Sequence, residues 1–185
     1  MAIETEFKFL VDKLTLYNFN DAQKYHIDQI YFDGSKRKEE LIALFPDIDI
    51  SMINTFRVRK IEDNKRTYFI ITLKSKAFPN GLSRYEYEKE ISEEVFNSLI
   101  HHNIDSEIIK NRYVDIFNGY KFEFDEYLNL KKDLVTVEVE VNNIELYEKE
   151  VARFLLMIKD HYGLDARDVT YNSIYKNSNL IKYFG

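Results

Sequence analysis

Eight segments of the sequence alternate charged or polar residues with apolar ones, or are rich in β-branched and aromatic residues, and this recurring pattern restricts the fold most. A period of two residues is typical of a β-strand, whose side chains point to its two faces in turn. Turn residues such as EDNK, FPNG and FNG separate several segments. The predicted strands cover residues 3–11, 27–33, 54–61, 66–76, 82–91, 107–117, 119–127 and 134–142.

Three other segments have the features of helices. Residues 35–45 follow the second predicted strand, and residues 92–102 begin with Ser92, a good N-cap residue, followed by two acids. Residues 144–163 carry apolar side chains at helical spacing and end at Gly163. Strands therefore outnumber helices, and the predicted fold class is α+β, dominated by an antiparallel sheet with helices packed outside it.

The composition limits the classes of function. A chain of 185 residues with 14 Tyr and 14 Phe can build a core, and residues 1–185 contain no Gly- or Pro-rich linker, so we expect a single domain. The net charge of -6 argues against general binding to nucleic acid or to a membrane surface. The absence of cysteine excludes disulfides, thiolate catalysis and cysteine-ligated metals. Without a signal peptide or a long apolar run, the predicted location is the cytoplasm.

The charged faces of the predicted strands carry both signs, with nine acids and nine bases. One such strand alone is typical of a sheet with a solvated face. Eight together favour a closed ring of about eight strands, whose interior is just wide enough for one small ligand. Charges inside such a ring must be paired or bound to a metal or ligand, because an unpaired buried charge is costly.

This mixture of charges suits a narrow range of chemistry. Carboxylates supply the oxygen ligands that Mg²⁺ or Mn²⁺ prefers, and Arg and Lys supply donors to phosphate oxygens. A site with both acids and bases therefore suits a complex of a metal with polyphosphate better than it suits the metal or the polyphosphate alone. Phosphoryl transfer depends mainly on positioning and charge neutralisation, so it needs no nucleophile of the Ser–His–Asp kind.

The order of these motifs resembles the CYTH superfamily, also called triphosphate tunnel metalloenzymes and named for class IV adenylate cyclases and thiamine triphosphatase. The segment Glu4-Thr5-Glu6-Phe7-Lys8 is similar to the ExExK signature of that superfamily, and the resemblance runs along nearly the whole chain. The later matches are QIYF at 29–32, Arg57-x-Arg59, Thr72-x-Lys74, Arg84-x-Glu86-x-Glu88, Lys110-x-Arg112, Asp125, Glu138-x-Glu140 and YKNSNL at 175–180.

The resemblance implies an eight-stranded antiparallel tunnel that binds a triphosphate or nucleoside triphosphate with Mg²⁺ or Mn²⁺. It implies that Glu4, Glu6 and Lys8 take part in catalysis. The metal group it implies is Glu4, Glu6, Glu88, Asp125, Glu138 and Glu140. The phosphate contacts it implies are Lys8, Arg57, Arg59, Lys74, Arg84, Lys110 and Arg112.

Three functions fit this reading. The first is a metal-dependent hydrolase of tripolyphosphate or another small triphosphate, in which water attacks the terminal phosphorus. The second is an adenylate cyclase that converts ATP to cyclic AMP and pyrophosphate, although nothing in the sequence identifies an adenine pocket. The third is a module that binds a nucleotide or polyphosphate without turnover. All signature acids are present, which favours an enzyme over the third function.

Residues 34–54 form a longer connection than simpler members of the superfamily have. This segment fits a cap over one tunnel mouth, a regulatory or oligomerisation element, or a tolerated surface excursion. The class IV cyclase branch is associated with a His-containing acidic motif, whereas the four histidines lie outside the acidic strands here. Symmetrical dimers are common among soluble proteins, so a homodimer is expected.

Overall fold

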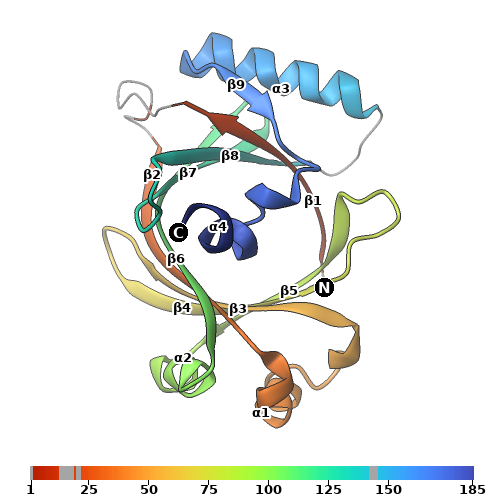
Figure 1. The fold of residues 1–185 in the computed structure, drawn as a ribbon, viewed down its shortest axis with the longest axis vertical. Helices are drawn as coiled ribbons and strands as arrows, with labels where there is room; N and C mark the ends of the chain where they lie inside the picture. The colour runs from red at the N-terminus through yellow and green to blue at the C-terminus, as the bar shows by residue number, and fades with distance from the viewer. Residues whose placement is uncertain (1, 13–18, 20–21, 142–145) are drawn as a thin grey trace.

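The computed structural model describes residues 2–12, 19, 22–141 and 146–185, and eight of its strands close into an antiparallel ring (Figure 1). The strands follow the order β5-β4-β3-β2-β6-β7-β8-β1, and β1 pairs again with β5 to complete the ring. The short β9 adds to β1 outside this circuit. The strand bounds are β1 Ala2–Val11, β2 Gln23–Phe32, β3 Ile53–Glu62, β4 Thr67–Ser75, β5 Ser83–Ile91, β6 Ile104–Phe117, β7 Tyr120–Tyr127, β8 Leu134–Glu140 and β9 Ala166–Asp168.

The helices are short except for one. The bounds are η2 Gly34–Arg37, α1 Lys38–Leu44, η3 Ile50–Met52, α2 Glu93–Ile100, α3 Tyr147–Tyr162, η4 Ser173–Tyr175 and α4 Asn177–Phe184, where η marks a 3-10 helix. Two predicted helix ends are confirmed. The Ser92 side chain caps α2 by accepting a hydrogen bond from the backbone N–H of Val95 at 3.3 Å, and Gly163 ends α3 in the left-handed conformation, with φ of 67°.

One core lies between the ring and α3. Phe7 and Phe9 of β1 point outward and are fully buried, because Phe154 of α3 packs against both rings. Val137 and Val139 of β8 join the same cluster. The apolar half of the alternation therefore faces the helix, and the charged half of β1 and β8 is directed into the ring.

A second core lies on the opposite outer side of the ring, under α1 and α2 (Figure 1). Leu41 and Phe45 are buried there against outward-facing strand residues such as Val58 and Ile71. Residues 34–54 therefore cover the outside of the sheet. The apolar side chains of this segment thus belong to the second core, while Asn54 at its end also lines the interior cavity.

The C-terminal helix α4 packs on the inner side of the ring, and Figure 1 shows it within the outline of the strands. Leu180 is fully buried against Ile108 of β6, Tyr127 of β7 and Leu134. Ile108 and Tyr127 share the inward parity of Lys110 and Asp125 on their strands. Part of the interior is thus filled by an apolar plug, and the rest is left to charged side chains.

The predicted eight strands are confirmed, while the strand β9 and the helices η3, η4 and α4 were not predicted. The strand predicted over 27–33 begins four residues earlier, at Gln23. Strand β9 has only three residues, too few for a visible alternation, and α4 has only eight. Residue 142, the last of the eighth predicted strand, and residues 144–145, the first of the third predicted helix, lie outside the described residues. None of the helices among the described residues is long and apolar enough to span a membrane.

Candidate active site

The inward side chains of the ring line a cavity of about 420 Å³. Seven glutamates and eight lysines or arginines line it, so its wall is nearly balanced in charge. The acids are Glu4, Glu6, Glu86, Glu88, Glu123, Glu138 and Glu140, and the bases are Lys8, Arg57, Arg59, Lys74, Arg84, Arg112, Lys121 and Lys176. The charged face of each strand thus points inward, as the alternation predicts.

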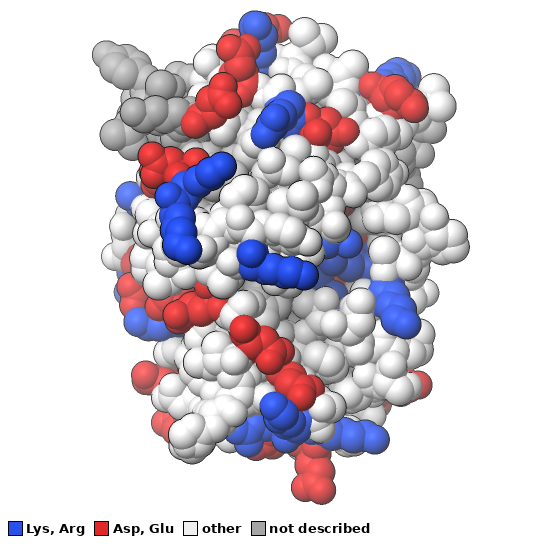
Figure 2. Space-filling model, viewed as in Figure 1, with Lys and Arg blue, Asp and Glu red and all other residues white. Residues whose placement is uncertain are grey.

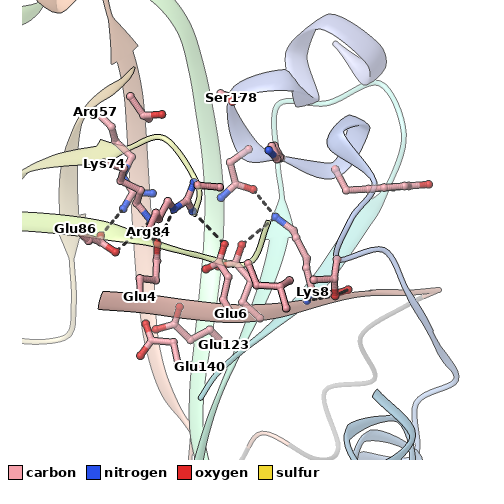
Figure 3. Close-up of a pocket in the computed structure, with 18 of the residues that line it drawn as sticks. Glu4, Glu6, Lys8, Arg57, Lys74, Arg84, Glu86, Glu123, Glu140 and Ser178 are labelled. Carbon is pink, nitrogen blue, oxygen red and sulfur yellow. Dashed lines mark hydrogen bonds and ion pairs between the residues drawn. The ribbon is translucent and has the colours of Figure 1, made fainter. Parts of the chain in front are cut away.

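Glu4 lies at the start of β1, where β1 meets β5 (Figure 3). Lys74 Nζ donates to both carboxylate oxygens of Glu4, at 2.7 and 2.8 Å, and Arg84 Nε donates to Oε2 at 2.9 Å. Removal from water alone would raise the pKa of Glu4, but the charges of Lys74 and Arg84 outweigh it and hold this pKa far below its ordinary value. Glu4 is therefore a fixed negative charge.

Glu6 shares the inward face of β1 but has fewer cationic partners. Its only ion pair among the described residues is with Arg84 Nη2, at 3.3 Å. Removal from water, with the nearby carboxylates of Glu4 and Glu138, raises the pKa of Glu6 to about 7. Removal from water raises the pKa of Glu86 to about 8, and Glu4 adds to that rise. The pKa of Glu86 is raised although Lys74 Nζ lies at 3.3 Å and Arg57 Nη2 at 3.5 Å from its carboxylate oxygens.

The far half of β1 brings Lys8 to β8. Lys8 is buried, and its Nζ donates to Glu138 Oε1 at 2.9 Å. The other oxygen of Glu138 accepts from Arg112 Nη2 at 2.9 Å, and Arg112 also pairs with Glu123. Burial would raise the pKa of Glu138, but Lys8 and Arg112 hold it well below its ordinary value. Strands β1, β6, β7 and β8 are thus joined by one charged network.

Arg57 and Arg59 project into the cavity from β3. Arg57 is buried and reaches Gln29 Oε1 and Thr72 Oγ1 only at 3.4 Å each, while Arg59 pairs with Glu88. In both arginines the Nε atom is buried and has no hydrogen-bond partner among the described residues. A buried donor without an acceptor costs roughly 1–3 kcal/mol, so an anion that supplied one would be bound favourably.

Lys110 and Asp125 differ from the other predicted site residues. Both are fully buried, and they do not belong to the residues that line the cavity. Lys110 Nζ donates to Asp125 Oδ2 at 2.6 Å, and Arg112 donates to both oxygens of Asp125 at 2.6 Å. Asp125 is therefore saturated by bases, and the pair lies behind the wall, where it supports Arg112.

The other predicted site residues all line the cavity: Glu4, Glu6, Lys8, Arg57, Arg59, Lys74, Arg84, Glu88, Arg112, Glu138 and Glu140. Glu86, Glu123 and Lys121 line it too, although the sequence assigned them no role beyond their charged faces. Their alternation with apolar neighbours was the available signal. Asn177 and Lys176, from the YKNSNL segment, also reach the cavity, and no periodic pattern pointed to them.

The acids face bases rather than one another. Among the described residues, no three carboxylate or imidazole groups already converge as a ligand set for a metal ion. The donor chemistry nonetheless fits a hard divalent cation, because the pKa of Glu6, which has one ion pair among the described residues, and that of Glu86, which has two, are both raised, so an added cation would stabilise their ionised forms. Outside the cavity, Figure 2 shows acidic and basic side chains intermixed over the visible face.

No family model matches the chain. An inorganic triphosphatase from Acetivibrio thermocellus is 28% identical to it over 183 residues, which are 98% of this chain and 95% of that protein. The solved structure of the inorganic triphosphatase NE1496 is 24% identical, covers 100% of this chain and 99% of its own, and has a TM-score of 0.57. A second solved structure is that of HpAC1, a putative adenylyl cyclase from Hippeastrum with a dominant triphosphatase activity. It is 15% identical, the match covers 97% of this chain and 95% of that one, and the TM-score is 0.60.

The two solved structures share the fold of this chain, and the Acetivibrio protein is similar along almost its whole length. The described ring contains the charged motifs in the order of the family signature, from Glu4-x-Glu6-x-Lys8 in β1 to Glu138-x-Glu140 in β8. The fold and the order of the motifs thus agree with the resemblance to the CYTH superfamily, the triphosphate tunnel metalloenzymes, and the similarity to an inorganic triphosphatase supports that resemblance.

Proposed function

We propose that this protein hydrolyses inorganic tripolyphosphate, or another small triphosphate, inside the ring with the help of Mg²⁺ or Mn²⁺. The observation that carries the proposal is the cavity wall of eight bases and seven acids, in which two arginines have Nε donors without an acceptor among the described residues. The similarity to the Acetivibrio inorganic triphosphatase supports the same substrate class.

The cavity bases are the proposed phosphate contacts. Arg57 and Arg59 each have a free Nε donor, and the planar guanidinium suits phosphate oxygens. The other proposed contacts are Lys8, Lys74, Arg84 and Arg112. Lys110 was predicted among them from the sequence, but we propose that it holds Asp125 and Arg112 in place, because its ammonium is sealed behind the wall.

The proposed metal ligands are five of the seven cavity acids: Glu4, Glu6, Glu88, Glu138 and Glu140. Because acids and bases nearly balance, a triphosphate without cations would leave a large excess of negative charge in the ring. A bound divalent ion supplies the missing positive charge and Lewis-acid polarisation of a phosphoryl oxygen. Asp125 is left out of this group, since its two oxygens are already occupied by Lys110 and Arg112.

The chain's own contribution to the reaction is positioning and charge stabilisation. The bases hold the phosphate chain, so that a water molecule can attack the terminal phosphorus in line with the leaving oxygen. The bond from that phosphorus to the bridging oxygen breaks, and orthophosphate and pyrophosphate are the products. The arginine and lysine donors stabilise the charge that develops on the leaving pyrophosphate.

The lining favours a compact polyanion over a nucleotide. Its aliphatic side chains are Ala77, Leu82 and Val169, whereas sites for organic ligands are mostly apolar and aromatic. Two tyrosines also line the cavity. The hydroxyl of Tyr31 accepts a hydrogen bond from Gln29 in a buried pair, and the hydroxyl of Tyr175 accepts one from Arg167 at 3.2 Å. The cyclase alternative has no comparable support, since it needs a wall that holds the adenine base.

A product assay tests the proposal. The purified protein is incubated with tripolyphosphate or ATP and either Mg²⁺ or Mn²⁺, and orthophosphate, pyrophosphate and cyclic AMP are measured separately. We expect equal amounts of orthophosphate and pyrophosphate from tripolyphosphate, and no product when the metal is chelated. Cyclic AMP with stoichiometric pyrophosphate from ATP would overturn the proposal in favour of a cyclase. Binding of tripolyphosphate without turnover of either substrate would leave a binding module instead.

A further inference from the structure

One side chain from outside the ring of strands reaches the cavity beside the charged network. Asn177 is the first residue of α4 and lines the cavity. Its Oδ1 accepts two hydrogen bonds, from Lys8 Nζ at 2.9 Å and from the Tyr127 hydroxyl at 2.6 Å. Figure 3 shows Lys8 opposite this part of α4, where the next residue, Ser178, is labelled.

These two bonds fix which way the amide points. A lysine ammonium has donors only, so the atom that faces Lys8 is the carbonyl oxygen and not the NH₂ group. Since Oδ1 is held by Lys8 and Tyr127, Nδ2 is turned away from them. Within the described part of the chain, no group accepts a hydrogen bond from Nδ2. A half-buried amide at the cavity surface thus keeps both of its donors available.

Lys8 is bound on two sides. Its Nζ donates to Glu138 Oε1 at 2.9 Å and to Asn177 Oδ1 at 2.9 Å. An ammonium has three N–H donors, and the residues that the structure describes accept from two of them, which leaves the third for a ligand. The free Lys8 donor and the free Asn177 donors therefore belong to adjacent groups, one from β1 and one from α4.

We propose that the Asn177 amide nitrogen donates a hydrogen bond to a phosphate oxygen of the bound substrate. This inference rests on the proposed function and adds a substrate-contact residue that lies outside the strands. Because Asn177 belongs to α4, a phosphate that binds it also favours the docked position of that helix. By thermodynamic linkage, docking of α4 in turn strengthens phosphate binding.

The variant Asn177→Asp separates this role from a structural one. An aspartate of the same shape still accepts from Lys8 and Tyr127, so α4 stays docked, but the donor is replaced by a negatively charged oxygen. We expect the dissociation constant of tripolyphosphate, measured by calorimetry with Mg²⁺ present, to rise by about tenfold or more. The melting temperature of the ligand-free protein should not fall. Asn97→Asp is the matched control, because Asn97 is an exposed residue of α2 outside the cavity and its side chain makes no hydrogen bond within the described part of the chain. The dissociation constant of this control should stay within about twofold of wild type.

A result in which wild type binds tripolyphosphate and Asn177→Asp binds it equally well would overturn the inference. If wild type itself does not bind tripolyphosphate, the proposed function fails first, and the two failures are thereby distinguished.

A second comparison applies if Asn177→Asp is less stable than wild type. Tyr127→Phe removes one donor to Oδ1 and leaves the amide nitrogen, whereas Asn177→Ala removes both the link to Lys8 and the nitrogen. A larger loss of affinity in Asn177→Ala supports the phosphate contact. Equal losses in the two variants would mean that Asn177 acts only by holding α4.

Discussion

Glu4 and Glu6 lie two residues apart on one face of β1, yet the protein holds them in opposite electrostatic states. Lys74 and Arg84 both contact Glu4 and keep its pKa far below the ordinary value, whereas removal from water and two neighbouring carboxylates raise the pKa of Glu6 to about 7. The difference comes from the neighbours on β4 and β5 and not from the residue type. Glu6 is thus the β1 carboxylate that gains most from an added cation.

This difference predicts the behaviour of Glu6→Gln. The change keeps the shape of the side chain and removes one proposed metal ligand, so activity on tripolyphosphate at fixed Mg²⁺ should fall by about tenfold or more and recover partly at higher Mg²⁺. The metal-free protein should melt no lower than wild type, because the variant relieves repulsion with Glu4 and Glu138. Product assays across a Mg²⁺ series, with melting curves in a chelator, check both. Unchanged activity at low Mg²⁺ would contradict the metal role.

Asp125 is expected to behave in the opposite way. Asp125→Asn leaves Lys110 buried without its carboxylate partner and removes one of the three carboxylates that contact Arg112. Breaking a buried pair in this manner costs about 3–5 kcal/mol of unfolding free energy. Lys110 and Arg112 lower the pKa of Asp125 despite its burial. Its stabilising charge is therefore present above the unfolded carboxyl pKa of about 3.9 and is lost as pH falls below it.

Urea unfolding of Asp125→Asn and wild type, at pH 7 and at pH 3 without metal, measures this difference. The gap in stability should be large at pH 7 and smaller at pH 3. A variant as stable as wild type at pH 7 would mean that Asp125 does not support the wall.

At the scale of elements, alternation indicates which face a side chain takes but not how deeply it lies. Lys110 and Lys74 have the same inward parity on their strands, yet Lys74 lines the cavity and Lys110 is sealed behind it. The sealing involves α4, whose Leu180 packs on Ile108 and Tyr127 next to Lys110. Helix α4 has only eight residues, too few for a helix to be stable alone, so tertiary packing fixes it. For that reason the strands and their inward faces were predictable, whereas the depth of Lys110 and the role of Asn177 were not.

The packing of α4 predicts a local effect of Leu180→Ala. Leu180 is fully buried, and a change of this kind typically costs about 2–5 kcal/mol. A helix of eight residues has little stability of its own. The lost packing energy should therefore appear as undocking of α4 and not as unfolding of the ring. Hydrogen exchange at residues 177–184 should become faster, with exchange in β1 and β8 unchanged. Leu128→Ala, at an exposed position of the wall, is the control. Equal exchange at residues 177–184 in wild type, Leu180→Ala and Leu128→Ala would contradict the role of Leu180.

At the scale of the whole molecule, the ring holds nearly equal numbers of both charges inside a protein whose net charge is -6. A triphosphate alone would add negative charge to a molecule already negative overall, and a metal alone would meet carboxylates that mostly have cationic partners. Only the complex of the two adds acceptors for the bases and positive charge for the acids. The charges on both sides of the ligand therefore act together.

Thermal stability should report this joint requirement. A ligand at about 100 times its dissociation constant raises the unfolding free energy by about 2.7 kcal/mol, which for a chain of this size corresponds to about 5–10 °C in melting temperature. We expect that shift with tripolyphosphate and Mg²⁺ together, under conditions where turnover is slow, and a much smaller one with either alone. Glu6→Gln should reduce the joint shift, and sulfate in place of tripolyphosphate should not reproduce it. The same shift with tripolyphosphate in a chelator would show that the bases alone hold the anion and that the inward acids have another role.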